Sequence, residues 1–263
     1  MEIKFLDISV KSIINHINLT INSKQITGIF QDTNNIIVRI LLNKVNYTGE
    51  VLINNENINT YESNLISYIQ ANPEFLTRTV SDEFFLNQRK TLNQEEYLLK
   101  IESVLNLVGL DKNYLTRLIN TLSTSEKYLL NIALNLIINP SIIIFQEPFL
   151  NLDKYYKNII KNIILELKRK YKKTIIIISN NINILYELTD NLIIFNKEII
   201  TDKTSNIYKT IKEDSNLELP DLIKFKQIAL KYNYKLNNYK DIKDLIKEVY
   251  KNVQETKKET WWN

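Results

Sequence analysis

The sequence predicts an α/β protein with a mostly parallel central sheet, an antiparallel β part near its start, a helical subdomain and a small C-terminal helical appendage. The first observation is that three isoleucine-rich runs, at 141–146, 174–179 and 191–196, are apolar without alternation. The second is that helical patterns separate these runs, and buried strands that alternate with helices are typical of a parallel sheet covered on both faces. The third is size, because 263 residues, 44% of them hydrophobic, suffice for one large domain and a small appendage.

The amino-acid composition excludes several classes of function. The chain has no cysteine, which excludes a disulfide scaffold, a thiol nucleophile and a cysteine-ligated metal. It has one histidine, His16, so a histidine metal cluster or serine–histidine catalysis is not expected. A net charge of +4 does not indicate a nucleic-acid-binding protein, and no nucleic-acid partner is expected. Only three glycines occur, so any function that needs a glycine-rich loop must work without one.

The first half of the chain has the pattern of short strands with one helix among them. Apolar alternation and short apolar runs predict strands at 2–9, 17–21, 26–30, after Gly49 and at 66–70. The strand ITGIF is followed by the polar QDTNN and then by the apolar IIVRILL, which is the pattern of a strand, a loop and a helix. Ligands of parallel α/β sheets bind where strands end and helices begin, so this loop is a candidate site.

The second half has the pattern of helices between buried strands. Apolar spacing predicts helices at 94–108, 113–119, 153–170 and about 183–188. Ser123 precedes another apolar helical run, with Glu126 three residues later, which predicts a capping box. The many lysines of 154–173 are expected to form a solvated helix face. A second candidate site is the end of 141–146, where Glu147 follows the strand.

The domain organisation follows from a change in composition near Thr204, after which the chain is charged and helical. We predict a large domain over 1–204, a helical subdomain within it at about 72–138, and an appendage over 205–263. The pair Trp261 and Trp262 has two readings, as an interface anchor or as part of a frayed tail.

Neither a signal peptide nor a membrane span is expected. The first residues, MEIKFLDISV, alternate in polarity and lack a basic start followed by an apolar run. The most apolar stretch, 129–145, contains three asparagines and Pro140 and changes its period at the proline, which indicates a helix followed by a buried strand. The expected location is the cytoplasm, on the inner face of the cell membrane through partners.

The order of segments resembles the nucleotide-binding subunit of an ABC transporter. KQITGIF resembles the strand that enters the phosphate loop, and ISYIQANPEF resembles the glutamine-loop region. TLSTSEKYLLNIALNLIINPSIIIFQEPFLNLD resembles the run from the signature motif to the D-loop. KKTIIIISNNINILYELTDNLIIFNKEIITDKT resembles the switch-histidine segment, and the tail resembles that of ATPase subunits of energy-coupling-factor (ECF) importers. The resemblance implies an ABC-ATPase-like P-loop fold.

The resemblance also assigns a role to each position of the first candidate loop. It places the family's glycines at 31, 34 and 36, its phosphate-binding lysine at 37 and its magnesium-binding hydroxyl at 38. Arg39 follows in the first helical turn. The nucleotide-binding positions are held here by Gln31, Asp32, Thr33, Asn34, Asn35, Ile36, Ile37, Val38 and Arg39.

The other family positions lie at the ends of later strands and at one helix start. The family's metal-binding carboxylate falls at Gln146, its general base at Glu147 and its switch histidine at Asn180. The D-loop aspartate is Asp153. The glutamine loop falls at Gln70 and Ala71, and the signature motif at Ser123, Thr124, Ser125 and Glu126.

The resemblance implies ATP and magnesium as cofactors, but the side chains predict weak or absent binding. Ile37 offers no charge to a phosphate and Val38 no oxygen to Mg²⁺. Gln146 can accept a hydrogen bond but brings no negative charge to a metal. Each lost charge-assisted contact removes roughly 1.5–3 kcal/mol, and catalysis in this family depends on such contacts.

The sequence thus predicts a degenerate ATP-binding-cassette subunit of an ECF-type importer of vitamins or metals, with little or no ATP hydrolysis in its own half-site. The implied partners are a second ABC ATPase subunit, in a heterodimer or a homodimer, and a membrane coupling subunit bound through about 70–86. Two alternatives stay open at this point. The first alternative is an active ABC ATPase that powers solute uptake. The second is a repurposed, non-catalytic interaction module.

Overall fold

The computed structural model describes most of the chain, in two compact units. The described residues are 1–30, 32, 35–61, 64–86, 93–195, 199–207, 219–232, 234, 236–237 and 243–251. The first unit comprises Met1–Thr27 and Asp32–Ile178, and the second comprises Gly28–Gln31 and Ser179–Asn263. The predicted boundary near residue 204 stays a prediction, and Trp261 and Trp262 lie outside the described residues.

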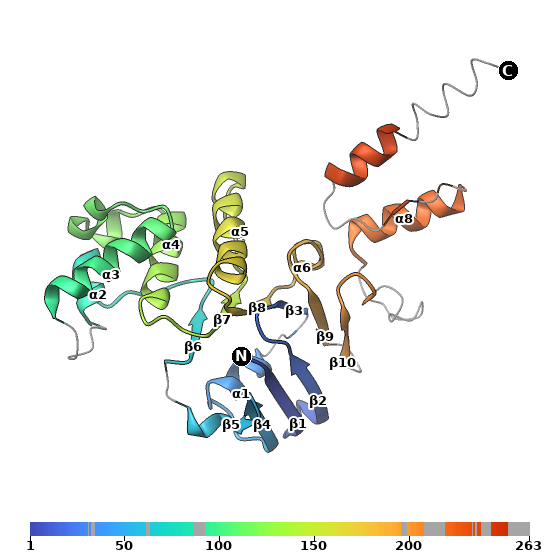
Figure 1. The fold of residues 1–263 in the computed structure, drawn as a ribbon, viewed down its shortest axis with the longest axis horizontal. Helices are drawn as coiled ribbons and strands as arrows, with labels where there is room; N and C mark the ends of the chain where they lie inside the picture. The colour runs from blue at the N-terminus through green and yellow to red at the C-terminus, as the bar shows by residue number, and fades with distance from the viewer. Residues whose placement is uncertain are drawn as a thin grey trace. The chain divides into compact units, whose positions relative to one another are not determined.

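The first unit contains a four-stranded antiparallel sheet, drawn in blue shades in Figure 1. Its strands run in the order β2-β1-β4-β5 and comprise Ile3–Val10 (β1), Ile14–Ile21 (β2), Thr48–Ile53 (β4) and Glu56–Asn57 (β5). Ile3 of β1 lies opposite Ile21 on one side and Ile53 on the other, and all three side chains are fully buried. Burial of one face explains the alternation that predicted these strands.

The second sheet has six strands in the order β10-β9-β3-β8-β7-β6. They comprise Ile26–Phe30 (β3), Ile66–Ile69 (β6), Ile142–Gln146 (β7), Thr174–Ile178 (β8), Asn191–Phe195 (β9) and Ile199–Lys203 (β10). β6, β7 and β8 pair in parallel, whereas β9 and β10 pair antiparallel. The isoleucines of β7 and β8 are 5% exposed or less, so the sheet confirms the predicted α/β class and the buried strands.

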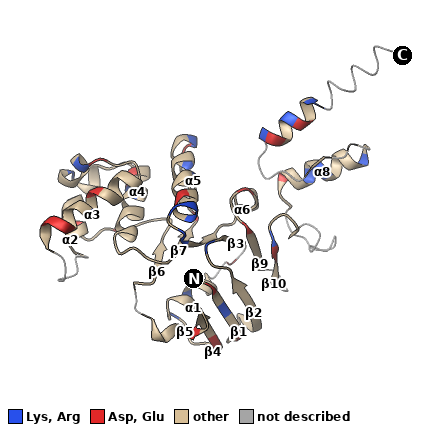
Figure 2. Ribbon diagram, in the orientation of Figure 1, with Lys and Arg blue, Asp and Glu red and all other residues tan. Residues whose placement is uncertain are grey.

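The first four described helices along the chain are Ile36–Leu41 (α1), Val80–Leu86 (α2), Gln94–Leu107 (α3) and Thr124–Leu136 (α4). Figure 1 shows α2, α3 and α4 grouped together, in green, within the region predicted as a helical subdomain. The later helices are Lys154–Arg169 (α5), Ile182–Leu188 (α6) and Asp221–Lys231 (α8), and a further helix covers 243–251. On α5 the isoleucines pack inward, and Figure 2 shows Lys and Arg along the helix, as predicted for a solvated face.

One predicted helix is wrong. The segment 113–119 forms two short 3₁₀ helices, Lys112–Thr116 (η2) and Ile119–Thr121 (η3). Between them the chain is extended, because Leu118 pairs with Thr79 in an isolated β-bridge and the Ile119 amide donates to the Arg78 carbonyl oxygen (2.9 Å). A tertiary contact therefore overrides the local helical pattern.

Many turns are left-handed without glycine. Among the described residues, twelve positions other than glycine have a positive φ: Asp7, Ser12, His16, Lys24, Asn35, Asn43, Asn54, Asn55, Asn139, Glu147, Asn151 and Lys172. Half of these residues are asparagine, which tolerates the left-handed region better than other side chains. Asparagine thus takes the place that glycine has in most turns.

Candidate functional site

The carboxylate of Asp32 occupies the start of α1, at the first candidate loop. Its Oδ1 accepts a hydrogen bond from the Ile36 amide (2.8 Å) and its Oδ2 accepts one from the Ile37 amide (3.2 Å). Asn35, the N-cap residue, is left-handed (φ 48°) and makes no side-chain cap bond. Asp32 therefore satisfies the first-turn amides of α1 with a carboxylate of the chain itself.

The side chains at the start of α1, which follow the first candidate loop, are buried. Ile36 and Ile37 are 1% exposed and Val38 is 3% exposed, so all three belong to the apolar core. Arg39 is half-buried within α1. The predicted positions Gln31, Thr33 and Asn34 lie outside the described residues.

Burial raises the pKa of the Asp32 carboxyl above its ordinary value of 3.8, and the two amide hydrogen bonds oppose this shift without reversing it. In the unfolded chain the carboxyl has its ordinary pKa. Between the two values the folded state binds more protons than the unfolded state. The Asp32 contribution to stability therefore falls as pH rises through this window, and its full cost is present only above the raised pKa.

We expect this cost to be visible when the wild type is compared with Asp32→Asn. The amide keeps the shape and one acceptor oxygen but does not titrate. As pH rises from below 3.8 to neutrality, the free energy of unfolding of the wild type should fall relative to that of the variant. Urea unfolding at a series of pH values measures the difference. Parallel pH profiles for the two proteins would contradict the assigned burial.

A tyrosine that the sequence reasoning did not identify lies beside this loop. The Tyr68 hydroxyl, from β6, donates to Oε1 of Gln146 at the end of β7 (2.6 Å). Burial and the charge of Asp32 both raise the pKa of Tyr68, so the hydroxyl lies within the electric field of that carboxylate. The structure therefore brings Asp32, Tyr68 and Gln146 together. The signal available in the sequence was the single polar ring in the buried strand ISYIQ.

The described residues provide poor ligands for a metal ion at this place. The acceptor oxygen of Gln146 is engaged by Tyr68, and the Val38 side chain is buried hydrocarbon. Within the described ranges, no group of three or more His, Cys, Asp or Glu side chains gathers as around a metal ion. Mg²⁺ prefers several oxygen ligands, including carboxylates, and this set does not supply them.

Glu147, at the predicted general-base position, has a left-handed backbone (φ 44°). Its amide donates to the Ile178 carbonyl oxygen of β8 (2.8 Å), which fixes the turn after β7. Burial and the charge of Glu147 both raise the pKa of Tyr128 on α4. The Tyr128 hydroxyl is buried and has no hydrogen-bond partner among the described residues. A carboxylate and an unpaired phenol thus face the same region at the end of β7.

The signature residues form their own polar cluster at the start of α4. Ser123 and Glu126 make the predicted capping box, with the Glu126 amide donating to Ser123 Oγ (3.2 Å) and the Ser123 amide to Glu126 Oε2 (2.8 Å). The Tyr114 hydroxyl also donates to Glu126 (2.6 Å), and Arg117 lies 3.6 Å away. These hydrogen bonds, Tyr114 first, lower the pKa of Glu126 and keep it charged. Thr124 is exposed and Ser125 half-buried.

The remaining predicted residues have simpler surroundings. Gln70 is exposed, its carbonyl oxygen accepts a hydrogen bond from Asn131 (3.3 Å), and Ala71 is half-buried. Asp153, which the sequence predicts as the first residue of this helix, is the N-cap of α5 and accepts from the Tyr156 amide (2.9 Å). Asn180 is exposed in the second unit, just after β8.

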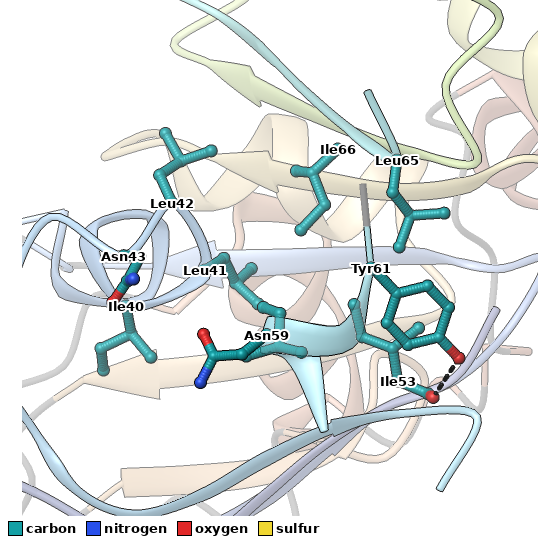
Figure 3. Close-up of a pocket in the computed structure, with 10 residues that line it drawn as sticks. Ile40, Leu41, Leu42, Asn43, Ile53, Asn59, Tyr61, Leu65 and Ile66 are labelled. Carbon is teal, nitrogen blue, oxygen red and sulfur yellow. Dashed lines mark hydrogen bonds between the residues drawn. The ribbon is translucent and has the colours of Figure 1, made fainter. Parts of the chain in front are cut away.

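A pocket of about 360 Å³ lies at the other end of α1 (Figure 3). It is lined by Ile40 to Asn43 and by residues of and near β4 and β6, including Ile53 and Ile66. The Tyr61 hydroxyl donates to the Ile53 carbonyl oxygen (2.8 Å), so its polar group is already satisfied. None of the predicted site residues is among the described residues that line this pocket.

None of the helices in the described part of the chain combines the length and the apolar composition of a membrane span.

Comparison with known proteins identifies sequence relatives. A family model described as "ABC transporter" matches residues 14–150. An ABC transporter ATP-binding protein of Staphylococcus aureus strain MRSA252 is 27% identical over 206 residues, which are 73% of this chain and 35% of that protein. The chain thus spans about a third of this relative. An ABC transporter ATP-binding protein of Pyrococcus furiosus is 32% identical over 191 residues, 67% of this chain and 70% of that protein.

Solved structures share the fold at low sequence identity. CbiO1 from Clostridium perfringens, part of the ABC transporter complex cbiONQ, matches with a TM-score of 0.73 and 17% identity. The match covers 88% of this chain and 95% of that structure. The ATP-binding cassette MJ0796, a dimer bound to ADP and phosphate, matches with a TM-score of 0.64 and 19% identity over 77% of this chain and 98% of its own.

Proposed function

The chain belongs to the ABC transporter ATP-binding family, and from this premise we propose that it is a non-hydrolysing cassette subunit of an ECF-type importer. In this role it pairs with a second, hydrolysing ATPase subunit and binds a membrane coupling protein on the inner face of the cell membrane. The likeness to CbiO1, a part of the cbiONQ complex, over 88% of this chain supports the class of transporter. Cassettes of the family bind ATP and Mg²⁺ in general, so the specific claims for this chain are weak or absent nucleotide binding and the absence of turnover in its own half-site.

The observation that carries the proposal is the pair of hydrogen bonds from the Ile36 and Ile37 amides to Asp32. Backbone amides at this kind of strand-to-helix loop hold phosphate oxygens in nucleotide-binding proteins. Here a carboxylate of the chain already uses two of them. A triphosphate would have to displace Asp32 and then lie beside its charge, with the lysine position filled by buried Ile37.

The end of β7 supports the same proposal. Gln146 brings no charge, and its oxygen accepts from Tyr68. Mg²⁺ would therefore have to compete with a short hydrogen bond for a neutral ligand. Glu147 remains at the base position, but a base alone cannot offset the missing positioning groups, because catalysis of phosphoryl transfer is mainly positioning and electrostatics.

The docking role is supported by the loop before α2, which is hydrogen-bonded to a buried carboxylate. The Glu83 carboxylate is only 5% exposed, and its Oε2 accepts from the amides of Leu76 (3.0 Å) and Thr77 (2.9 Å) and from the Thr77 hydroxyl (2.8 Å). The Leu76 side chain is 82% exposed. An apolar side chain held outward by a satisfied buried carboxylate suits a protein contact within the proposed docking segment 70–86.

Calorimetry with Mg-ATP tests the proposal directly. The purified chain alone should give no binding heat up to about 1 mM nucleotide, which bounds the binding free energy at about −4 kcal/mol. Its background ATP hydrolysis should be the same in the wild type and in Glu147→Gln. Micromolar binding with turnover that Glu147→Gln abolishes would show an active ATPase instead.

The partner half of the proposal needs a second measurement. Mixed with a cassette subunit that retains the glycine loop, its lysine and both magnesium ligands, the chain should co-elute as a heterodimer and the mixture should bind Mg-ATP. Leu76→Asp should weaken capture of the membrane coupling subunit, whereas Leu99→Asp, at an exposed leucine outside 70–86 (64%), should not. Failure to bind any cassette or membrane subunit would favour a repurposed interaction module.

A further inference from the structure

A cavity of about 270 Å³ lies in the first unit, at the end of the second sheet where β7 and β8 begin. Asn139 and Pro140, just before β7, line the cavity, and so does Lys173, just before β8. The candidate nucleotide site lies instead where β3 and β7 finish. The cavity is therefore a separate place in the fold, and none of the described residues that line it is a predicted site residue.

Apolar side chains of three helices form most of the cavity walls. α3 contributes Val104 and Leu107, α4 contributes Leu136, and α5 contributes Leu167. Leu136 and Leu167 are 7% and 1% exposed, whereas the two α3 residues are only half-buried. The protein therefore leaves apolar surface of α3 uncovered at the cavity. Small-molecule sites have mainly apolar walls of this kind, with a few polar groups that fix the ligand.

Two lysines bring positive charge to this cavity, and no carboxylate is among its described lining residues. The half-buried Lys173 donates from its ammonium group to Oδ1 of Asn139 (2.7 Å), which is a neutral acceptor. Burial lowers the pKa of the Lys173 ammonium, because the charged form loses solvation there. Lys100, exposed on α3, makes no ion pair or hydrogen bond with the described part of the chain. Both lysines therefore lack an anionic partner within the described ranges.

Backbone hydrogen bonds fix the two turns that carry Lys173 and Asn139. After α5, the Lys173 amide donates to the Leu167 carbonyl oxygen (3.0 Å). After α4, the Asn139 amide donates to the Leu136 carbonyl oxygen (2.9 Å). These bonds also satisfy carbonyl oxygens at the negative ends of the two helices, which weakens the repulsion of an anion there.

We propose that this cavity binds a small organic anion, a carboxylate or a phosphate monoester with a compact apolar body. The anionic head binds Lys100 and Lys173, with the Ser103 hydroxyl one turn after Lys100 on the same helix. The body packs against Val104 and Leu107. An ammonium group that has lost solvation gains a charge-assisted hydrogen bond when an anion enters. The inference is independent of the proposed transporter role.

Calorimetry on the full-length chain with benzoate and with phenyl phosphate tests the proposal. At least one of them should bind at a single saturable site with a dissociation constant below about 1 mM. Comparison of the two shows which anionic head the site prefers. Benzyl alcohol keeps the ring without the charge, and acetate keeps the charge without the ring. Each should bind at least about tenfold more weakly than the tighter of the two anions.

Variants of the cavity identify the residues that bind the anion. Lys173→Met keeps an apolar stem without the charge and should weaken binding at least about tenfold. Lys172→Met is the matched control, since Lys172 is the neighbouring lysine, is exposed and is not among the described lining residues. Lys100→Met should also weaken binding, and it removes an exposed charge without disturbing the core. Val104→Phe keeps both lysines but fills part of the cavity, so it should prevent binding.

Several results would contradict the proposal. Heat that grows with ligand concentration without saturation would show that the chain has no such site. Equal losses in Lys173→Met and Lys172→Met would mean general charge attraction, and benzyl alcohol binding as tightly as benzoate would mean an apolar contact alone. Binding unchanged in Val104→Phe would place the anion elsewhere. If Lys173→Met does not fold, as judged by circular dichroism, Lys100→Met decides. None of these measurements requires nucleotide or a partner subunit.

Discussion

Replacing Ile37 by lysine, the residue that the family resemblance assigns to this position, is expected to destabilise the protein by roughly 3 kcal/mol and to create no nucleotide site. The Ile37 side chain is 1% exposed and belongs to the apolar core, so an ammonium group would have to be desolvated there. If it reached Asp32, the resulting buried ion pair would still be less stable than the apolar packing by roughly 1–4 kcal/mol. Urea unfolding measures the loss.

The control for this experiment is Ile37→Met, which has a similar length without the charge. A volume-conserving apolar exchange of this kind costs less than about 1.5 kcal/mol. Calorimetry on Ile37→Lys should show no Mg-ATP binding, because Asp32 would neutralise the new charge. A lysine variant that is as stable as the methionine variant, or that binds nucleotide, would mean that the loop opens more easily than its burial indicates.

Gly49→Ala is expected to cost at least about 2 kcal/mol, through steric overlap and backbone strain together. Gly49, the second residue of β4, has a φ of +93°, which residues with a side chain rarely adopt. A Cβ at this position would overlap the carbonyl oxygen of Asp7 and lie 2.5 Å from that of Leu6, both in the neighbouring strand β1. Both are backbone atoms next to the Leu6–Glu50 pair of β1 and β4, so neither can give way as cheaply as the end of a flexible side chain.

Gly109→Ala separates the two causes. Gly109 also has a positive φ (+81°), but a Cβ there would meet no atom within 4 Å. Its alanine variant should therefore lose only the backbone term, about 1–2 kcal/mol. Thermal or urea unfolding of both variants gives the comparison. Equal losses for Gly49→Ala and Gly109→Ala would show that the close approach of β1 has no energetic effect.

The strands and helix starts were predictable because their causes are local. Isoleucine runs that are apolar on both faces indicated the buried strands β7 and β8, and both were found within a residue of their predicted ends. Ser123 was recognisable as a helix cap from the residues that follow it. The relation of segments 121–153 to the family followed from their order along the chain.

The contacts of the candidate site were not predictable, because they depend on register and side-chain direction. The family resemblance predicts that the lysine and the metal ligands are lost, but no sequence pattern predicts that the Asp32 carboxylate accepts hydrogen bonds from the α1 amides. The hydrogen bond from Tyr68 to Gln146 requires the parallel register of β6 and β7, which no local pattern specifies. The extended chain at Leu118 likewise depends on Thr79, far away in sequence.

The left-handed asparagines have a consequence for how this chain can change. At Asn35, Asn43, Asn54 and Asn55, the left-handed backbone angle itself restricts which residues can replace asparagine. Drift at these places is therefore confined to a narrow set of residues, with glycine the exchange that relieves strain. Substitutions at these turn residues could therefore raise the melting temperature of the protein without any change in its isoleucine-rich core.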